Sequence, residues 1–216
     1  MTPLVSILLA LHVASGVLVL AAAVVSFVSK WLDLPHRTHV VSGLAFVIGM
    51  SSIVITAVVL SVIRPNPFLL LIALFSTYLT FSGWRYAKNR LGQPSGIDWA
   101  LLGCGLLTAL GMMGWSALSN SSLRIVGVAF GGIQAILVLL DFRILRSGGV
   151  RGRLRVIRHL NLMIGATIAA TTAFTVNTIR TVEPEWLVWL APTVLMAPII
   201  VIWTRKVRGG HLVKGM

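Results

Sequence analysis

Charged residues are scarce in this chain, and acidic ones are the scarcest. Its 216 residues include 5 Asp and Glu, and charged residues make up 11% of the sequence. Soluble domains carry roughly 25% charged residues. The apolar share is 57% and the mean hydropathy is +0.95, so the composition excludes both a soluble globular domain and a disordered chain.

Cysteine and the common catalytic motifs are also lacking. Cys104 is the single cysteine, and it stands in an apolar run. One cysteine excludes an internal disulfide and a thiolate metal cluster, and no metal site is predicted. The sequence has no phosphate-binding glycine loop, HExxH motif or Ser–His–Asp arrangement. A hydrolase or ATPase is therefore not favoured, and whether the chain is an enzyme stays open.

Long hydrophobic runs are what the sequence has in abundance. A spanning helix needs about 20 apolar residues, and seven such runs are separated by segments rich in turn-forming residues. They predict an all-α, polytopic membrane bundle of seven transmembrane helices, with residues 1–216 forming a single integral membrane domain. The predicted spans are Pro3–Ser29, His39–Ile63, Pro67–Ala87, Trp99–Leu118, Leu123–Leu145, Val156–Asn177 and Glu185–Thr204.

The cations predict the orientation of the bundle. Of the 18 Lys and Arg, 15 follow the first, third, fifth and seventh runs. The remaining three are Arg64, Arg124 and Arg180. Since cytoplasmic loops carry the excess of Lys and Arg, we expect the N-terminus outside and the C-terminus, with Lys214, in the cytoplasm. The expected location is the cell (inner) membrane, as a multi-pass protein.

The expected partners follow from the same distribution. The cations lie between hydrophobic runs and form no basic stripe with interleaved aromatic residues, so nucleic acid is not an expected partner. The lipid bilayer is the expected surrounding. Another membrane protein or a second copy of the chain stays open as a partner.

Several polar side chains fall inside the predicted spans, where ionisable groups are costly and usually face the bundle interior. The topology places four of them near the cytoplasmic end, on four different spans: His39, Arg85, Asp141 and His159. We expect one shared cluster there, with Asp141 paired to Arg85 or Arg143, because a carboxylate at that depth needs a cation. The other polar residues of this group are His12, Tyr78, Gln134 and Asn177.

Three functions remain open for this cluster. The favoured one is a structural or accessory membrane subunit in which the polar residues tie helices together. An alternative is a haem b-binding or quinone-linked redox protein, in which His39 and His159 are axial ligands and Met163 is a substitute ligand. The third is a proton-coupled transporter of small solutes, in which Asp141 relays protons.

Five short blocks of residues resemble a known family. They are His12-x3-Gly16, His39-x3-Gly43-x6-Met50, Tyr78-x4-Gly83-x-Arg85, Asp141-x-Arg143, and a longer block that runs from Arg158-His159 through Met163 and Gly165 to Asn177. The chain resembles a family of uncharacterised prokaryotic multi-spanning membrane proteins, known as a domain of unknown function. The resemblance implies the topology and the recurring polar positions, and it implies no activity. Val40 and Val41 follow His39 where that family usually has basic residues, which argues against anion binding there.

Overall fold

The computed structural model describes residues 3–179 and 181–209, so Arg180, His211 and Lys214 lie outside the described residues. Within these ranges the chain forms seven α-helices and no strand. The helices are α1 (Pro3–Trp31), α2 (His36–Ile63), α3 (Pro67–Lys88), α4 (Gly96–Leu118), α5 (Arg124–Arg146), α6 (Gly152–Thr178) and α7 (Trp186–Arg208). All seven are long and apolar enough to cross a membrane, which confirms the all-α, seven-helix prediction.

Several helices extend beyond the predicted spans by polar turns. α6 begins at Gly152 rather than Val156, and α7 continues to Arg208 rather than Thr204. α4 begins at Gly96, where the Asp98 carboxylate accepts the backbone N–H of Ser95 at 2.8 Å. Hydropathy detects only the apolar part of a helix. The predicted spans therefore omit the charged turns that continue a helix into the membrane–water interface.

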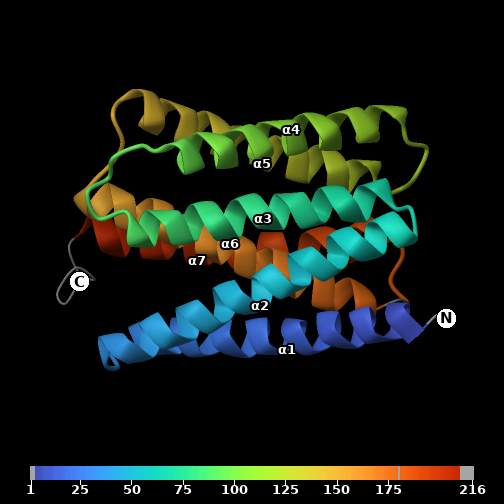
Figure 1. Cartoon of the computed structure of the whole chain (residues 1–216), viewed down its shortest axis with the longest axis horizontal. Helices are drawn as coiled ribbons and strands as arrows, with labels where there is room; N and C mark the ends of the chain where they lie inside the picture. Colours follow the sequence, from blue (N-terminus) through green and yellow to red (C-terminus); the bar gives the residue numbers. More distant parts are fainter. Residues whose placement is uncertain (1–2, 180, 210–216) are drawn as a thin grey trace.

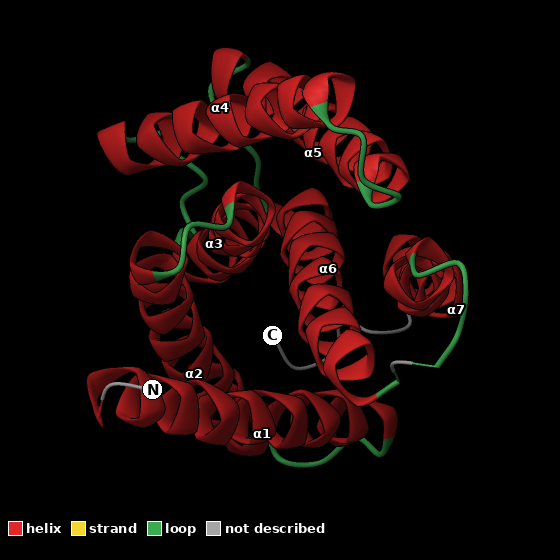
Figure 2. Cartoon of the chain, turned by 90° about the vertical axis from the view of Figure 1, so that its right-hand side faces the viewer, coloured by secondary structure: helices red, strands yellow, loops and turns green. Residues whose placement is uncertain are grey.

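The helices lie side by side along the long axis of the molecule (Figure 1). α1 packs on α2, and α4 packs on α5. α3 and α6 contact one another between these two pairs, and α7 packs on α6 (Figure 2). The two central helices therefore connect the α1–α2 pair to the α4–α5 pair, and residues at their interface can reach both.

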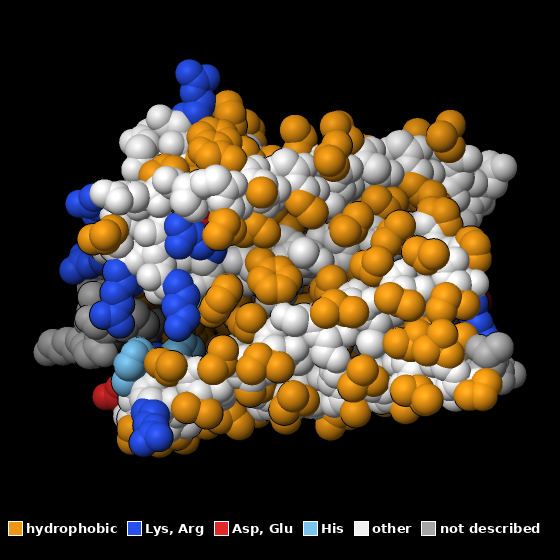
Figure 3. Space-filling model, in the orientation of Figure 1, with side chains coloured by type: hydrophobic (Ala, Val, Ile, Leu, Met, Phe, Trp, Pro, Cys, Tyr) orange, Lys and Arg blue, Asp and Glu red, His pale blue; other side chains and the backbone are white. Residues whose placement is uncertain are grey.

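Side chains are sorted along the long axis. On the face drawn in Figure 3, hydrophobic side chains cover the middle of the bundle, and Lys and Arg gather at the end where α1 ends and α2 begins. Apolar side chains such as Leu107 and Leu195 are more than two-thirds exposed. Such a belt suits lipid, in which apolar side chains need no cover and every backbone group is bonded within its helix.

Small residues set the closest helix contacts. A Cβ added to Gly131 of α5 would lie 3.1 Å from Met112 Cβ of α4, and one added to Gly127 would clash with Ser116. A Cβ added to Gly83 of α3 would lie 2.9 Å from Met163 Sδ of α6. Close packing through small residues is how helices associate in lipid, where no hydrophobic force drives them together.

Candidate functional site

Two polar groups of residues lie on different sides of α6. Arg158 and His159 are consecutive on this helix, so their side chains leave it about 100° apart. Arg158 bonds to Asp141 of α5, whereas His159 bonds to the backbone of α3 and lies beside His39 of α2. The sequence places these residues at one depth, and the turn of the helix separates them into two sites.

The first site contains two histidines whose rings are held by backbone carbonyls. His159 Nδ1 donates to the carbonyl oxygen of Gly83 at 2.8 Å, and His39 Nδ1 donates to that of Ser26 at 3.2 Å. A carbonyl only accepts, so the proton of each ring is on Nδ1, and in the neutral ring Nε2 keeps its lone pair. Neither Nε2 takes part in a hydrogen bond with any part of the chain that the structure describes.

The ring of His39, on α2, lies next to the ring of His159, on α6. Their centroids are 6.4 Å apart and their planes are perpendicular. Gly83 makes this position available to His159, because Met163 and Leu162 pack directly on the glycine and bring α6 against α3. On the other side, Ser26 of α1 also hydrogen-bonds through its hydroxyl to Ser42 of α2, at 2.7 Å.

Both histidines line a cavity of about 390 Å³ that is bounded by α1, α2, α6 and α7. Its wall is mostly apolar and includes Phe46, Met163 and Trp203. Gly43, one turn after His39, also lines the cavity, and a Cβ added there would meet no atom within 4 Å. The histidines thus adjoin an apolar space with room beside them.

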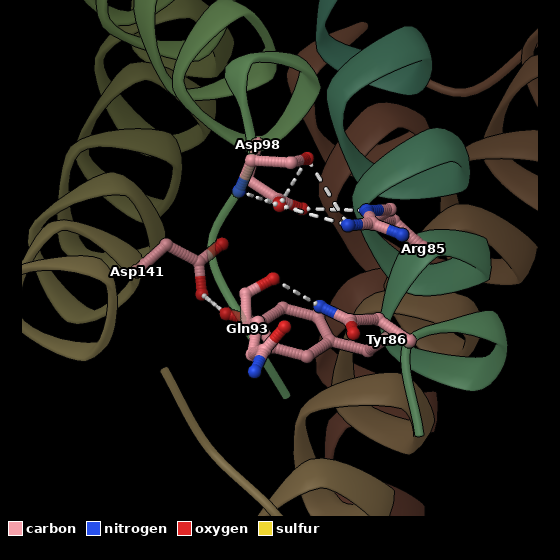
Figure 4. Close-up of polar contacts among 7 residues, drawn as sticks. Arg85, Tyr86, Gln93, Asp98 and Asp141 are labelled. Atoms are coloured by element: carbon pink, nitrogen blue, oxygen red, sulfur yellow. Dashed lines mark hydrogen bonds and ion pairs between the residues drawn. The ribbon is translucent and has the colours of Figure 1, made fainter. Parts of the chain in front are cut away.

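The second site is a buried carboxylate with a complete set of donors. Asp141 accepts hydrogen bonds from Tyr78 Oη at 2.5 Å, from Tyr86 Oη at 2.8 Å, and from Arg158 Nε and Nη2 at 3.0 and 2.5 Å. Asp141 and Arg158 are 5% and 6% exposed, so the ion pair is buried. Figure 4 shows Asp141 turned toward Tyr86. The network joins α3, α5 and α6, and it suits a structural tie because a buried charge must be paired.

Asp141 pairs with Arg158, and the prediction that it pairs with Arg85 or Arg143 is wrong. Arg85 pairs instead with Asp98 of α4, with its Nε 2.9 Å from Oδ1 (Figure 4). Arg143 is exposed, one turn from the end of α5. Arg158 was expected among the cations that follow the fifth run, and neither Tyr86 nor Asp98 was expected at this site. The signal for Arg158 was its position beside His159 at the start of a span.

The expected single cluster is likewise divided. Arg85 and Asp141 do share a small cavity of about 30 Å³, which Tyr78, Tyr86 and Asp98 also line. A space of that size holds a water molecule. His39 and His159 line the other, apolar cavity, and among the described residues neither makes a hydrogen bond to Asp141. Asp141 and His159 therefore belong to separate sites.

The other predicted polar residues lie outside both groups. His12 Nδ1 is 2.9 Å from Thr56 Oγ1 and so joins α1 to α2. Gln134 is fully buried and donates to the carbonyl of Gly105 at 3.3 Å. Asn177 is exposed near the end of α6, where its amide donates to the carbonyl of Ala173 at 2.7 Å.

Other binding sites and relatives offer no further guide. No group of three or more His, Cys, Asp or Glu that could hold a metal ion occurs in residues 3–179 and 181–209. Comparison with protein-family models, curated proteins and solved structures found no match. The resemblance to a domain of unknown function stays a prediction, and the function has to be argued from the two sites themselves.

Proposed function

We propose that this chain is an integral protein of the cell (inner) membrane that binds one haem b, with His39 and His159 as the two axial ligands. The observation that carries the proposal is the 6.4 Å separation of the two ring centroids. An imidazole nitrogen lies about 2 Å from a metal that it binds and about 1 Å from its own ring centre, so two axial histidines have centroids about 6 Å apart.

The hydrogen bonds of the two rings also suit ligation. A metal-binding histidine almost always donates its other ring N–H to a carboxylate, a backbone carbonyl or water, which fixes the tautomer and the orientation of the ring. The Nδ1 bonds to Gly83 and Ser26 do this for His159 and His39. They leave Nε2, the nitrogen farther from the backbone, for the iron.

The walls of the cavity suit a flat, mostly apolar ring with acidic substituents. Small residues make room for a porphyrin in a helix bundle, and Gly43 leaves open space next to His39. Lys30 lines the same end of the cavity, where its ammonium group can pair with a propionate. A haem bound here supplies one-electron redox chemistry, and the chain supplies its ligands and its apolar surroundings.

The structural alternative accounts for the whole of the second site, but at the first site it accounts only for the Nδ1 bonds of the two histidines to α1 and α3. Asp141, Arg158 and the two tyrosines bond across three helices, as a tie requires. His39 and His159 make no bond to one another, although their rings are adjacent. A tie through these two rings is therefore a weaker explanation than a ligand between them.

The absorption spectrum of the detergent-purified, haem-reconstituted protein tests the proposal. We expect a Soret band and the low-spin spectrum of bis-histidine haem. His39→Ala and His159→Ala should each lose the low-spin form, and added imidazole should restore it. His36→Ala, which removes an exposed histidine at the start of α2, is the matched control and should leave the spectrum unchanged. No Soret band in the wild type, or low-spin spectra in both alanine variants, would overturn the proposal.

The proposed orientation has the N-terminus outside and the C-terminus in the cytoplasm. It is supported by the collection of Lys and Arg at the end of the bundle where α1 ends and α2 begins (Figure 3). The two histidines lie near that same end, because His39 is in the first turns of α2 and His159 in the first turns of α6. The haem site is therefore proposed to be on the cytoplasmic side.

A further inference from the structure

We infer that the end of the apolar cavity near Thr171, which we call its inner segment, binds a lipid-soluble hydroquinone. The bonds would be made by the hydroxyl oxygens of Thr167 and Thr171. This inference rests on the proposed haem function for its biological meaning, because a hydroquinone is a redox partner for haem. The binding itself depends on residues other than the two histidines.

The cavity is longer than a haem at its histidine end requires. Along α6 it extends from Val156 to Thr171, and from His159 to Thr171 is about 18 Å of helix rise. Side chains on a helix lean toward its N-terminus, so the ring of His159 leans toward Val156, away from Thr171. The segment near Thr171 is therefore beyond the reach of a ring held by the two histidines.

The two threonine hydroxyls of the inner segment can each accept a hydrogen bond from a ligand. Thr167 Oγ1 donates to the carbonyl of Met163 at 3.0 Å, and Thr171 Oγ1 donates to that of Thr167 at 2.9 Å. Because each hydroxyl proton is already used within the helix, each oxygen presents its lone pairs as an acceptor. Acceptors select a ligand with donors, such as the two O–H groups of a hydroquinone, over an acyl chain.

The spacing of the two hydroxyls fits such a ring. Thr167 and Thr171 are four residues apart on α6, so they lie on one face with a rise of about 6 Å between them. That rise is comparable to the separation of the two oxygens across a six-membered hydroquinone ring. The surrounding wall, with Leu20, Ile164 and Met196, is apolar and suits the methyl groups and tail of the molecule.

The cavity lies next to the two most exposed helices of the bundle. Its wall includes α1 and α7, the two helices of which the smallest share is buried. Both lie at the margin of the bundle (Figure 2). They meet near the Lys30 end, where the rings of Phe27 and Trp203 are 5.1 Å apart. A lipid-soluble ligand would therefore approach the inner segment from the bilayer, between or beside α1 and α7.

Equilibrium dialysis with two probes that share one ring and differ in their hydrogen-bond donors tests the inference. The protein in lipid nanodiscs is kept reduced with ascorbate under argon, and trimethylhydroquinone is compared with its dimethyl ether, which lacks both donors. We expect the hydroquinone to bind about tenfold or more tightly than the ether. Thr167→Val and Thr171→Val should each weaken hydroquinone binding by about three- to tenfold, as the loss of one hydrogen bond predicts, and leave ether binding unchanged.

Matched variants separate this inference from the haem proposal. Thr175→Val removes a hydroxyl one turn farther along α6, outside the cavity wall, and should bind the hydroquinone as the wild type does. His159→Ala should lose the low-spin haem spectrum and keep Thr171-dependent hydroquinone binding. Equal binding of the two probes, or unchanged affinity in both valine variants, overturns the inference even if haem is present. Thr171-dependent binding in a protein without a Soret band would instead overturn the haem proposal alone.

Discussion

His159 Nδ1 donates to the carbonyl oxygen of Gly83 at 2.8 Å, across the place where α6 packs directly on α3. The glycine has two effects there. Its carbonyl fixes the ring of the histidine, and its lack of a side chain lets Met163 and Leu162 approach the backbone. Packing and ligand orientation therefore depend on the same residue.

We expect Gly83→Ala to weaken both effects. The new Cβ would lie 2.9 Å from Met163 Sδ and 3.1 Å from Leu162 Cβ, so α6 must shift away from α3. Overpacking of this kind costs about 1–3 kcal/mol, and the shift should lengthen the Gly83–His159 bond. Thermal unfolding in detergent and the fraction of protein that retains haem measure the two effects. Gly103→Ala is the control, since a Cβ there meets no atom within 4 Å and should leave both quantities unchanged.

Replacing the charged member Asp141 of the buried ion pair by an uncharged residue should lower the free energy of unfolding substantially. Asp141→Asn leaves the Arg158 guanidinium, 6% exposed, without its counter-charge, and such a change costs about 3–5 kcal/mol. Asp98→Asn, which removes the carboxylate of the part-exposed pair with Arg85, should cost about 1 kcal/mol or less. The unfolding temperatures of the two variants are the measurement. A much lower unfolding temperature for Asp141→Asn than for Asp98→Asn would show that Asp141 holds the helices together. Equal effects would mean that the buried network is not a tie.

The α4–α5 contact predicts different results at two adjacent glycines. Gly131→Leu should destabilise the protein by about 1–3 kcal/mol, because Met112 and Met113 already fill the space beside that position. A Cβ at Gly132 meets no atom within 4 Å, so Gly132→Leu should be tolerated. The comparison uses thermal unfolding of the two variants in the same detergent. A lower stability of Gly132→Leu than of Gly131→Leu would contradict the helix packing described above.

The orientation is tested by reporter fusions at loops on the two sides. A fusion after Gly148, between α5 and α6, should report a cytoplasmic position, and one after Ser121, between α4 and α5, an external one. A phosphatase active only outside and a fluorescent protein active only inside give opposite signals at each point. The reverse pattern would place the two histidines on the external side.

The sequence alone predicts what depends on composition and on distance along a helix. Seven apolar runs predict the seven helices because a bilayer of fixed thickness requires a fixed length of apolar helix. The common depth of His39 and His159 is predictable for the same reason, since each stands at a known distance from the end of its run. The polar turns that lengthen α6 and α7 are missed because they lie outside the apolar part of the helix.

The tertiary structure alone decided which of these residues meet. Depth places Asp141 level with Arg85, Arg143 and Arg158, and only the packing of α3, α5 and α6 selects Arg158 as its partner. The same packing turns His159 away from Asp141 and toward His39. In lipid the outer faces of helices are as apolar as their contacts, so hydropathy gives little information about the rotation of a helix or its neighbours. Those are fixed by close packing at residues such as Gly83, and by the few polar bonds that this packing allows.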